Sequence, residues 1–276
     1  MTIKQALRQG SQALEAASVP DAAWDAALLL SLVTSKPALW LRANGFEELD
    51  PAVYDRYNAL IARRATREPL QYILGSVPFE GVEITVSPDA LIPRMDTEVL
   101  FERTVSRLTG TEKVLDLCTG TGVLAIALKH RFPSLTVFAA DKSEAALSLA
   151  RKNALANKTD IIFRQGDLFE AVGEERFDLI LSNPPYIDAA DMLTLQAEVL
   201  QEPRMALYGG EDGLDFYRRI VADAPAHLTP GGALLFEIGC SQAAAVSSLM
   251  SDHFHSILVT RDLAGLDRCV EGTMRG

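Results

Sequence analysis

Four consecutive residues, Asn183-Pro184-Pro185-Tyr186, are of types that could hold a planar amide or amino nitrogen. They directly follow residues 177–182, an apolar run with the length of a buried strand. A proline keeps the residue before it out of the helical region, so this turn is stiff, and prolines have no N–H to donate. The polar groups of the turn are therefore mostly carbonyl oxygens, which suit a substrate that brings two N–H donors.

The chemistry expected of this turn is methyl transfer to a nitrogen that is a poor nucleophile because its lone pair is delocalised. If the Asn183 side-chain oxygen and the Pro184 carbonyl each accept one N–H, the lone pair can face a sulfonium methyl group. The acceptor becomes cationic during transfer, and two fixed carbonyl dipoles favour that transition state. We therefore expect Asn183, Pro184 and Tyr186 to serve catalysis, with the Tyr186 ring packing on the flat acceptor. A proline-rich turn without chemistry is the alternative interpretation.

A second candidate site is the loop Cys118-Thr119-Gly120-Thr121-Gly122, which separates an apolar strand pattern from a helix pattern. Glycine there lets the backbone approach a ligand closely. Asp141 follows about 20 residues later at the end of the next strand, where a carboxylate can accept hydrogen bonds from both ribose hydroxyls. Because residues 120–125 also fit the pattern G-x-G-x-x-A, a dinucleotide cofactor stays open on this loop alone.

Two further features favour S-adenosylmethionine over a dinucleotide. Asp116 lies two residues before the loop, where a carboxylate suits a cationic cofactor end and suits a pyrophosphate poorly. Gly166-Asp167-Leu168 ends the third strand pattern, at the carboxyl edge of the sheet where ligands bind in such folds. We therefore expect a sulfonium cofactor beside the glycine loop.

The N-terminal part of the chain has the sequence patterns of several helices followed by a β-hairpin linker. Apolar residues recur there at helical spacing, and Thr2 with Gln5 has the spacing of a capping box. Asp21 and Asp50-Pro51 are candidate helix starts. Residues 82–86 alternate between apolar and polar side chains, which predicts a β-hairpin.

Beyond Asp96, strand and helix patterns alternate, which is typical of a mostly parallel sheet covered on both faces. The predicted strands are residues 114–117, 136–140, 161–165, 177–182, 233–238, 256–260 and about 268–272. The link between the last two is too short for a parallel crossover, so the last strand must run antiparallel. We predict an α/β protein with a helical bundle at residues 1–75, a β-hairpin linker at 76–95 and a seven-stranded catalytic domain at 96–276.

Composition and charge argue against several classes of protein. Apolar residues make up 48% and charged residues 23% of the chain, as in soluble globular proteins, and no apolar run is long enough to span a bilayer. The net charge of −11 repels a phosphate backbone, and the sequence has no basic stripe. We expect a monomer that binds neither nucleic acid directly nor a membrane.

The cysteines favour a reducing compartment. Cys118, Cys240 and Cys269 are odd in number and far apart, without CxxC spacing or a nearby histidine ligand pattern. We therefore expect neither a disulfide framework nor a metal site, and we interpret His253 and His255 as surface residues. With no signal-peptide pattern, these features predict a cytoplasmic location.

The sequence resembles the peptide chain release factor glutamine methyltransferases, also called HemK-type enzymes. The similar stretches are Arg67–Gly75, Leu91–Glu98, Asp116–Gly122, Asn183–Tyr186, Gln201–Pro203 and Asp262–Gly265. The glycine loop is common to many methyltransferases, whereas Ile92–Glu98 together with Asn183–Tyr186 is more specific. The resemblance implies a Rossmann-like class I methyltransferase domain that uses S-adenosylmethionine. It also implies that the acceptor is the side-chain N5 of the glutamine in the Gly-Gly-Gln motif of release factors, with the N-terminal domain holding the protein substrate.

Motif matching carries site residues over from this family. The positions implied at the cofactor are Asp116, Cys118, Thr119, Gly120, Thr121, Gly122, Asp141, Leu168 and Asn183, and those implied at the glutamine are Asn183, Pro184, Pro185 and Tyr186. Cys118 stands where the family usually has glycine, Met95 where it usually has proline, and Leu168 where an aromatic residue is expected. A positive φ at position 118 would strain a cysteine. Leu168 would contact adenine through its backbone alone.

Three alternatives stay open. A ribosomal-protein glutamine methyltransferase would have the same acceptor turn. Nucleic-acid adenine or guanine amino-methyltransferases also use an Asn-Pro-Pro-aromatic turn, but the acidic net charge argues against them. A non-catalytic binding module would have no need of the glycine loop together with Asp141 and Asn183.

Overall fold

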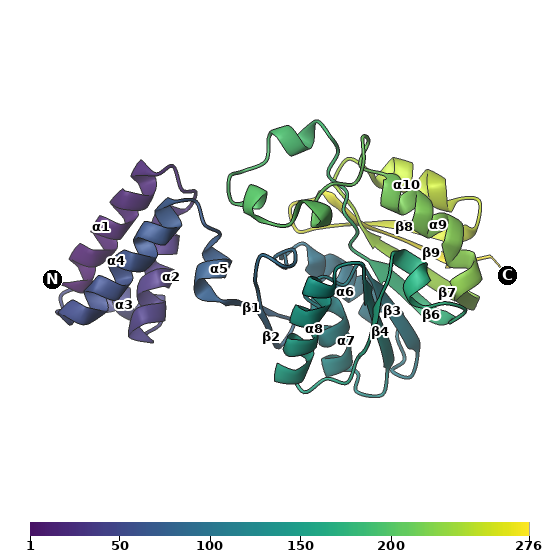
Figure 1. The fold of residues 1–276 in the computed structure, drawn as a ribbon, viewed down its shortest axis with the longest axis horizontal. Helices are drawn as coiled ribbons and strands as arrows, with labels where there is room; N and C mark the ends of the chain where they lie inside the picture. The colour runs from purple at the N-terminus through teal and green to yellow at the C-terminus, as the bar shows by residue number, and fades with distance from the viewer. Residues whose placement is uncertain (276) are drawn as a thin grey trace. The chain divides into compact units, whose positions relative to one another are not determined.

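The chain forms two compact units in the computed structural model, which describes residues 1–275 (Figure 1). One unit, here named the helical unit, consists of Met1–Gly75 and the distant segment Gln196–Gln201. The other, named the sheet unit, consists of Ser76–Leu195 and the chain from Glu202 onward. The segment Gln196–Gln201 thus packs with helices that precede it by more than a hundred residues.

The helical unit encloses its own apolar core. Its elements are α1 (Ile3–Ala16), α2 (Ala22–Thr34), α3 (Ala38–Ala43), α4 (Pro51–Ala65), α5 (Leu70–Leu74) and the 3-10 helix η3 (Val199–Gln201). Leu14, Leu30 and Leu41 from three different helices are fully buried in this core, together with the Tyr57 ring. This arrangement is the predicted helical bundle.

Helix starts in this unit lie where they were predicted, but one of them lacks its capping bond. Thr2 and Gln5 form a reciprocal capping box at α1, and the Asp50 carboxylate accepts from the Ala52 N–H at 2.8 Å, with Pro51 as the first helical residue. Asp21 occupies the N-cap position of α2, which confirms the predicted start. Its φ is 52° and its side chain makes no capping hydrogen bond, so the expected capping contact is absent.

The sheet unit begins with the predicted hairpin and continues into a seven-stranded sheet (Figure 1). The hairpin strands are β1 (Ser76–Phe79) and β2 (Val82–Thr85), and the sheet strands are β3 (Lys113–Leu117), β4 (Thr136–Asp141), β5 (Ile162–Gln165), β6 (Phe177–Ser182), β7 (Leu228–Glu237), β8 (Phe254–Arg261) and β9 (Asp267–Met274). Their order is β5-β4-β3-β6-β7-β9-β8.

Strand directions confirm the predicted topology. The neighbours from β5 to β7 are parallel, and β9 is antiparallel to both β7 and β8. The antiparallel last strand is therefore confirmed, although β7 starts at Leu228, earlier than the predicted residue 233. The strand order reverses between β3 and β6, and such folds bind ligands in the crevice at that point.

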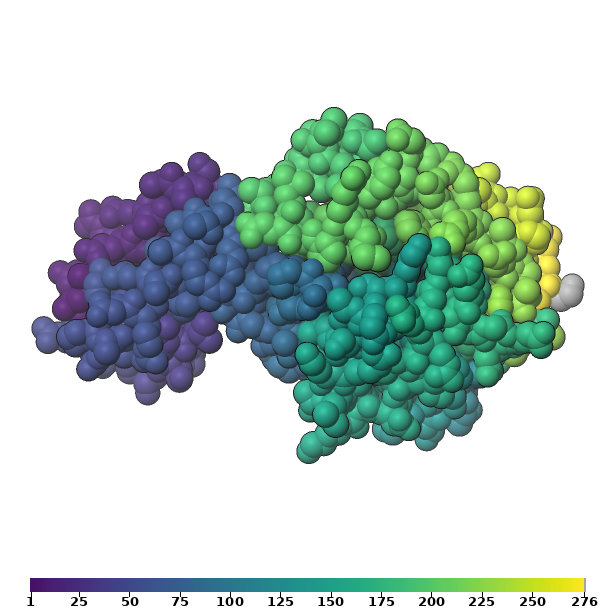
Figure 2. Space-filling view, viewed as in Figure 1, coloured from purple at the N-terminus to yellow at the C-terminus, as the bar shows by residue number. Residues whose placement is uncertain are grey.

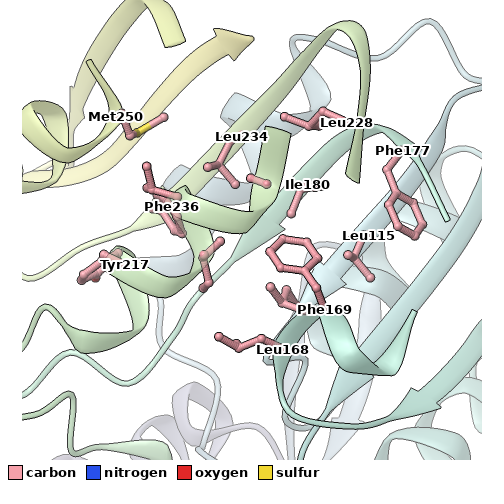
Figure 3. Packing of buried hydrophobic residues seen from close by; sticks show 14 of the residues in the cluster. Leu115, Leu168, Phe169, Phe177, Ile180, Tyr217, Leu228, Leu234, Phe236 and Met250 are labelled. Atoms are coloured by element: carbon pink, nitrogen blue, oxygen red, sulfur yellow. The ribbon is translucent and has the colours of Figure 1, made fainter. Parts of the chain in front are cut away.

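Helices cover both faces of the sheet, and the edge strands β5 and β8 keep several exposed residues among those described. They are α6 (Thr97–Val105), α7 (Val123–Arg131), α8 (Glu144–Ala156), α9 (Asp215–His227) and α10 (Ala243–Met250), and shorter 3-10 helices are η1 (Leu168–Ala171), η2 (Asp191–Leu193) and η4 (Arg204–Ala206). Leu115 belongs to the same apolar cluster as Tyr217 of α9 and Met250 of α10 (Figure 3). Its neighbour Val114 belongs to the opposite cluster, with Phe101 of α6, as the alternation of side chains along a strand requires.

No helix within residues 1–275 is both long enough and apolar enough to cross a bilayer.

Candidate active site

A cavity of about 580 Å³ lies at the carboxyl ends of the parallel strands of the sheet unit. Asp116 of β3, Asp141 of β4 and Asn183 after β6 all line it. In Figure 2 the green part of the chain, which includes residues 203–208, meets the teal part, which includes residues 140–146, and both contribute to the lining. The parallel sheet thus brings together side chains that are far apart in the sequence.

Asp116 is a buried carboxyl group with one unused oxygen. Its side chain is 1% exposed, and its Oδ2 accepts hydrogen bonds from the Thr119 hydroxyl at 2.6 Å and the Ala125 N–H at 3.2 Å. Oδ1 has no hydrogen-bond partner among the described residues. Burial raises the pKa of Asp116 to about 7, although both hydrogen bonds lower it. An unpaired carboxylate oxygen in the wall of a cavity fits a cationic ligand group.

The glycine loop turns the chain from β3 into α7. Cys118 has a φ of 63°, so the backbone at this position is left-handed and a cysteine is strained there. The Thr119 N–H donates to the Ala140 carbonyl at 3.0 Å, which ties the loop to β4. At Gly122 an added Cβ would lie 3.1 Å from the Ala150 Cβ, so glycine permits the close packing of α7 on α8.

Asp141 ends β4, Leu168 begins η1 shortly after β5, and both line the same cavity. The Asp141 oxygens accept from the Gly120 N–H and the Ser143 N–H, each at 2.9 Å, and each oxygen keeps a further lone pair. Burial raises the pKa of Asp141, although these backbone hydrogen bonds lower it. Leu168 has a φ of 53°, so its backbone is left-handed at the start of η1. The residue is buried, with 6% of its surface exposed.

The acceptor turn, defined as Asn183–Tyr186, is held from both sides. Before it, the buried Ser182 hydroxyl donates to the Leu117 carbonyl of β3 at 2.6 Å. After it, the Tyr186 carbonyl accepts from the Gln242 side chain at 3.0 Å. A Cβ added at Gly209 would lie 2.6 Å from the Pro185 carbonyl oxygen, so the returning chain packs directly against the turn.

Two stretches that carry the family resemblance meet at the rim of the cavity. The Glu202 carboxylate is 5% exposed, accepts from the Ile92 N–H at 2.9 Å and forms an ion pair with Arg94. Pro93 on one side and Pro203 on the other line the cavity. This buried contact therefore fixes the rim of the cavity between two segments that are distant in the sequence.

Comparison with known proteins identifies the family. Residues 5–75 match the PrmC N-terminal domain and residues 94–211 match the methyltransferase small domain. The release factor glutamine methyltransferase of Geobacter sulfurreducens is 42% identical over 273 residues, covering 98% of this chain and 96% of that protein. The chain belongs to the release factor glutamine methyltransferase family. The family member from Deinococcus radiodurans is 41% identical over 278 residues, covering 100% of each chain.

Solved structures share the fold of this family member. A methyltransferase from Pyrococcus furiosus superimposes with a TM-score of 0.56 at 21% identity, covering 70% of this chain and 89% of that one. A T. thermophilus 16S rRNA N2 G1207 methyltransferase in complex with AdoMet and guanosine gives a TM-score of 0.53 at 21% identity, covering 72% and 50%. Because one neighbour acts on RNA, the fold alone does not distinguish a protein substrate from a nucleic acid.

Most of the predicted site residues of this methyltransferase line one cavity: Asp116, Cys118, Thr119, Gly120, Thr121, Asp141, Leu168, Asn183 and Pro185. Gly122, Pro184 and Tyr186 are not part of that lining within the described chain. Gly122 precedes α7 as its N-cap, and Pro184 is buried. The Tyr186 ring packs against the apolar cluster beneath α9 and α10.

Other residues of the cavity wall were not predicted. They include Thr97 at the start of α6, Phe216 in α9 and Met205 in η4. In the sequence, Thr97 lies within a stretch that resembles the family, whereas Phe216 and Met205 look like ordinary apolar positions. Their place in the wall depends on how distant segments fold back, which periodicity does not reveal.

Proposed function

We propose that this chain transfers a methyl group from S-adenosylmethionine to the side-chain amide nitrogen of the glutamine in the Gly-Gly-Gln motif of peptide chain release factors. The observation that carries the proposal is a single cavity lined by a candidate cofactor site, Asp116 with Asp141, and by Asn183 of the acceptor turn. The names of the full-length relatives support the choice of release factors over ribosomal proteins. The net charge of −11 weighs against a nucleic-acid substrate.

The cavity suits S-adenosylmethionine, which would supply a methyl group bound to a cationic sulfur. Asp116 would accept hydrogen bonds from the ammonium end of the cofactor through its unpaired Oδ1. Asp141 has lone pairs left for the ribose hydroxyls, and the backbone at Leu168 would contact the adenine. The loop Cys118–Gly122 would approach the cofactor with its backbone.

The acceptor turn would hold the glutamine amide by its two N–H groups. In this proposal the Asn183 side-chain oxygen and the Pro184 carbonyl each accept one of them, which aims the nitrogen lone pair at the methyl group. Pro185 would line the channel for the glutamine side chain. We assign Tyr186 a supporting role, because its ring packs against the core and its carbonyl is fixed by Gln242.

We further propose that the helical domain, residues 1–75, holds the release factor, that residues 76–95 form a linker and that the catalytic domain begins at residue 96. A cytoplasmic location follows from this substrate, because release factors act in translation. The similarity of residues 5–75 to the PrmC N-terminal domain supports the first assignment.

The proposed substrate can be tested by methyl labelling. We expect purified protein and labelled S-adenosylmethionine to label a release factor, and to leave unlabelled a release factor whose Gly-Gly-Gln glutamine is replaced by alanine. Equal labelling of both would place the methyl group elsewhere. Labelling of a ribosomal protein or of RNA in whole-cell extract, with the release factor unlabelled, would contradict the proposal.

Within the same assay, Asn183→Ala tests the acceptor turn. We expect kcat to fall by about a hundredfold or more, because one of two oriented acceptors is lost, while cofactor affinity changes by less than about threefold. The matched control is Asn58→Ala, an exposed asparagine of α4, which should leave both unchanged. Unchanged turnover in Asn183→Ala would refute the role of Asn183.

A further inference from the structure

Glu237 lies beside the acceptor turn without lining the cavity. Its strand, β7, is the parallel neighbour of β6, and Phe236 is opposite Ser182. Glu237 ends β7 and Asn183 directly follows β6, so the two residues occupy matching positions at the ends of neighbouring strands. Side-chain interactions with Thr97 and Asn183 lower the pKa of the Glu237 carboxyl group. Glu237 thus lies behind Thr97 and Asn183, two residues that line the cavity.

This carboxyl group is costly to bury, and the fold gives it little compensation. Glu237 is 1% exposed, and its Oε2 has no hydrogen-bond partner in the described part of the chain. Burial raises its pKa to about 7, while the hydrogen bonds from Thr97 and Asn183 and the positive charge of Arg268 lower it. A strand of apolar residues would be more stable with an apolar side chain at this position. A buried acid of this kind next to a candidate active site indicates a functional role.

We propose that Glu237 is a positioning residue that fixes the orientation of the Asn183 side-chain amide; this inference rests on the proposed function. A carboxylate can only accept hydrogen bonds, so it can face only the NH₂ end of Asn183. The Asn183 oxygen then points away from Glu237, where it can accept an N–H from the substrate glutamine. With the amide reversed, Asn183 would present its own N–H groups to those of the substrate, and the acceptor would be lost.

The arrangement makes turnover depend on the ionisation of Glu237. A protonated Glu237 can donate to the Asn183 oxygen and so withdraw it from the substrate. The Glu237 pKa of about 7 means that kcat should be low below neutral pH, rise as the pH increases through 7, and level off once the carboxylate is ionised.

The other titratable groups near Glu237 are not expected to produce a rise in kcat near pH 7. The charged and titratable groups around it are Asp96 before α6, Arg268 and Cys269 on β9, Tyr186 on the acceptor turn and Tyr217 on α9. Burial raises the pKa values of Tyr186, Tyr217 and Cys269, which moves their titration further from neutral pH. Asp116 also has a pKa of about 7, but its proposed partner is the cofactor, so saturating cofactor separates the two groups.

The test measures kcat between about pH 6 and 9 at saturating S-adenosylmethionine and release factor. We expect wild type to show the rise near pH 7. Glu237→Gln should show no such rise, with kcat about ten- to a hundredfold lower and cofactor affinity within about threefold of wild type. The matched control is Glu271→Gln, another glutamate that is 1% exposed but pairs with Arg103 and Arg107. It should keep the wild-type pH profile even where its stability falls.

A double-mutant cycle distinguishes positioning from a general structural effect. If Glu237 acts through Asn183, then Glu237→Gln added to Asn183→Ala should lower kcat no further than about twofold. A further tenfold loss, or a Glu237→Gln enzyme with the wild-type profile, would overturn the proposal. If Glu237→Gln does not fold, the wild-type profile decides, because a kcat independent of pH across neutrality also overturns it. Failure of wild type to methylate a release factor would instead contradict the proposed function itself.

Discussion

Cys118 is one of the residues at which the chain departs from the pattern expected of its family, and its left-handed backbone disfavours a side chain. The family similarity implied glycine here, and the observed φ of 63° explains that preference, because only glycine adopts this conformation without a clash of its Cβ. The cysteine side chain is half-buried and packs against the apolar cluster beneath α9. At position 118 the cysteine therefore adds backbone strain, and its side chain adds a small packing contact with the apolar cluster.

At this position we predict that Cys118→Gly is more stable than Cys118→Ala by about 1 kcal/mol. Both variants remove the thiol, but alanine keeps the Cβ that clashes at positive φ. Urea unfolding without cofactor measures the difference, and cofactor affinity should match wild type in both. An alanine variant as stable as the glycine variant would mean that position 118 is not left-handed in solution.

Individual site residues differ in how far the sequence could predict them. Asp116 and Asp141 were predictable because each lies at the end of an apolar run, and parallel strands all end at the same edge. Glu237 was not, since in the sequence it is only a polar residue after an apolar strand. Its contact with Asn183 depends on which strand pairs with β6, and that neighbour, β7, is separated from β6 by a long connection.

At the scale of elements, sequence signals succeeded where they were local. The capping box of α1 and the Asp50-Pro51 start of α4 depend on residues within one helical turn. The short helices α3 and α5 were not predicted, because five or six residues are too few to show a helical period. Asp21 marks the start of α2 as predicted, but its side chain does not cap the helix because its backbone is left-handed, a conformation that aspartate tolerates.

The packing of α1 on α4 leads to a prediction for Gly10. Alanine normally stabilises a helix interior relative to glycine. Here a Cβ at position 10 would lie 2.0 Å from the Tyr57 hydroxyl oxygen, inside a fully buried contact. We therefore expect Gly10→Ala to lower the free energy of unfolding by about 2 kcal/mol, measured by urea denaturation.

The Tyr57 hydroxyl provides the control for this prediction. It is buried without a hydrogen-bond partner in the part of the chain that the structure describes. Tyr57→Phe removes the closest clashing atom but keeps the ring Cζ, which would lie 2.8 Å from the added Cβ. It should therefore restore part of the stability lost in Gly10→Ala while changing wild type little. No rescue in the double variant would show that the loss has another cause.

At the scale of the whole molecule, the segment Gln196–Gln201 belongs to the helical unit although its neighbours in sequence belong to the sheet unit. Glu198 accepts hydrogen bonds from the buried Arg64 at 2.8 Å and from Arg67 at 2.7 and 2.5 Å, and Asp25 holds Arg64 from the other side. The Gln201 side chain donates to the Arg67 carbonyl at 2.8 Å. An ion pair across so long a stretch of chain leaves no periodic signal, so the sequence alone could not predict it.

We predict that Glu198→Ala lowers the free energy of unfolding by about 2 to 3 kcal/mol, because the buried Arg64 loses one of its two carboxylate partners. It should also raise the KM for the release factor severalfold, since residues 203–208 of the cavity wall follow this segment. Cofactor affinity should not change. The control is Glu47→Ala in the same unit, an exposed residue without an ion pair among residues 1–275, which should leave both quantities at wild-type values.

Acid should have the same effect as this substitution. Burial raises the pKa of Glu198, but hydrogen bonds from Arg67 and Arg64 outweigh burial and lower it to about 2. The stabilisation is therefore fully present above the ordinary pKa of a glutamate and is lost as the pH falls toward 2. The stability difference between wild type and Glu198→Ala should shrink over that range.

The chain leaves the sheet unit after Leu195 and re-enters it at Glu202. This insertion also limits which segments can be exchanged between this protein and a relative. A chimaera that exchanged residues 1–75 between two relatives would join the arginines of one parent to the inserted segment of the other. If position 198 of the second parent lacked a carboxylate, the buried Arg64 guanidinium would lose this ion-pair partner. The N-terminal helices and the segment Gln196–Gln201 must therefore come from the same parent. A chimaera with a single crossover between them would take them from different parents.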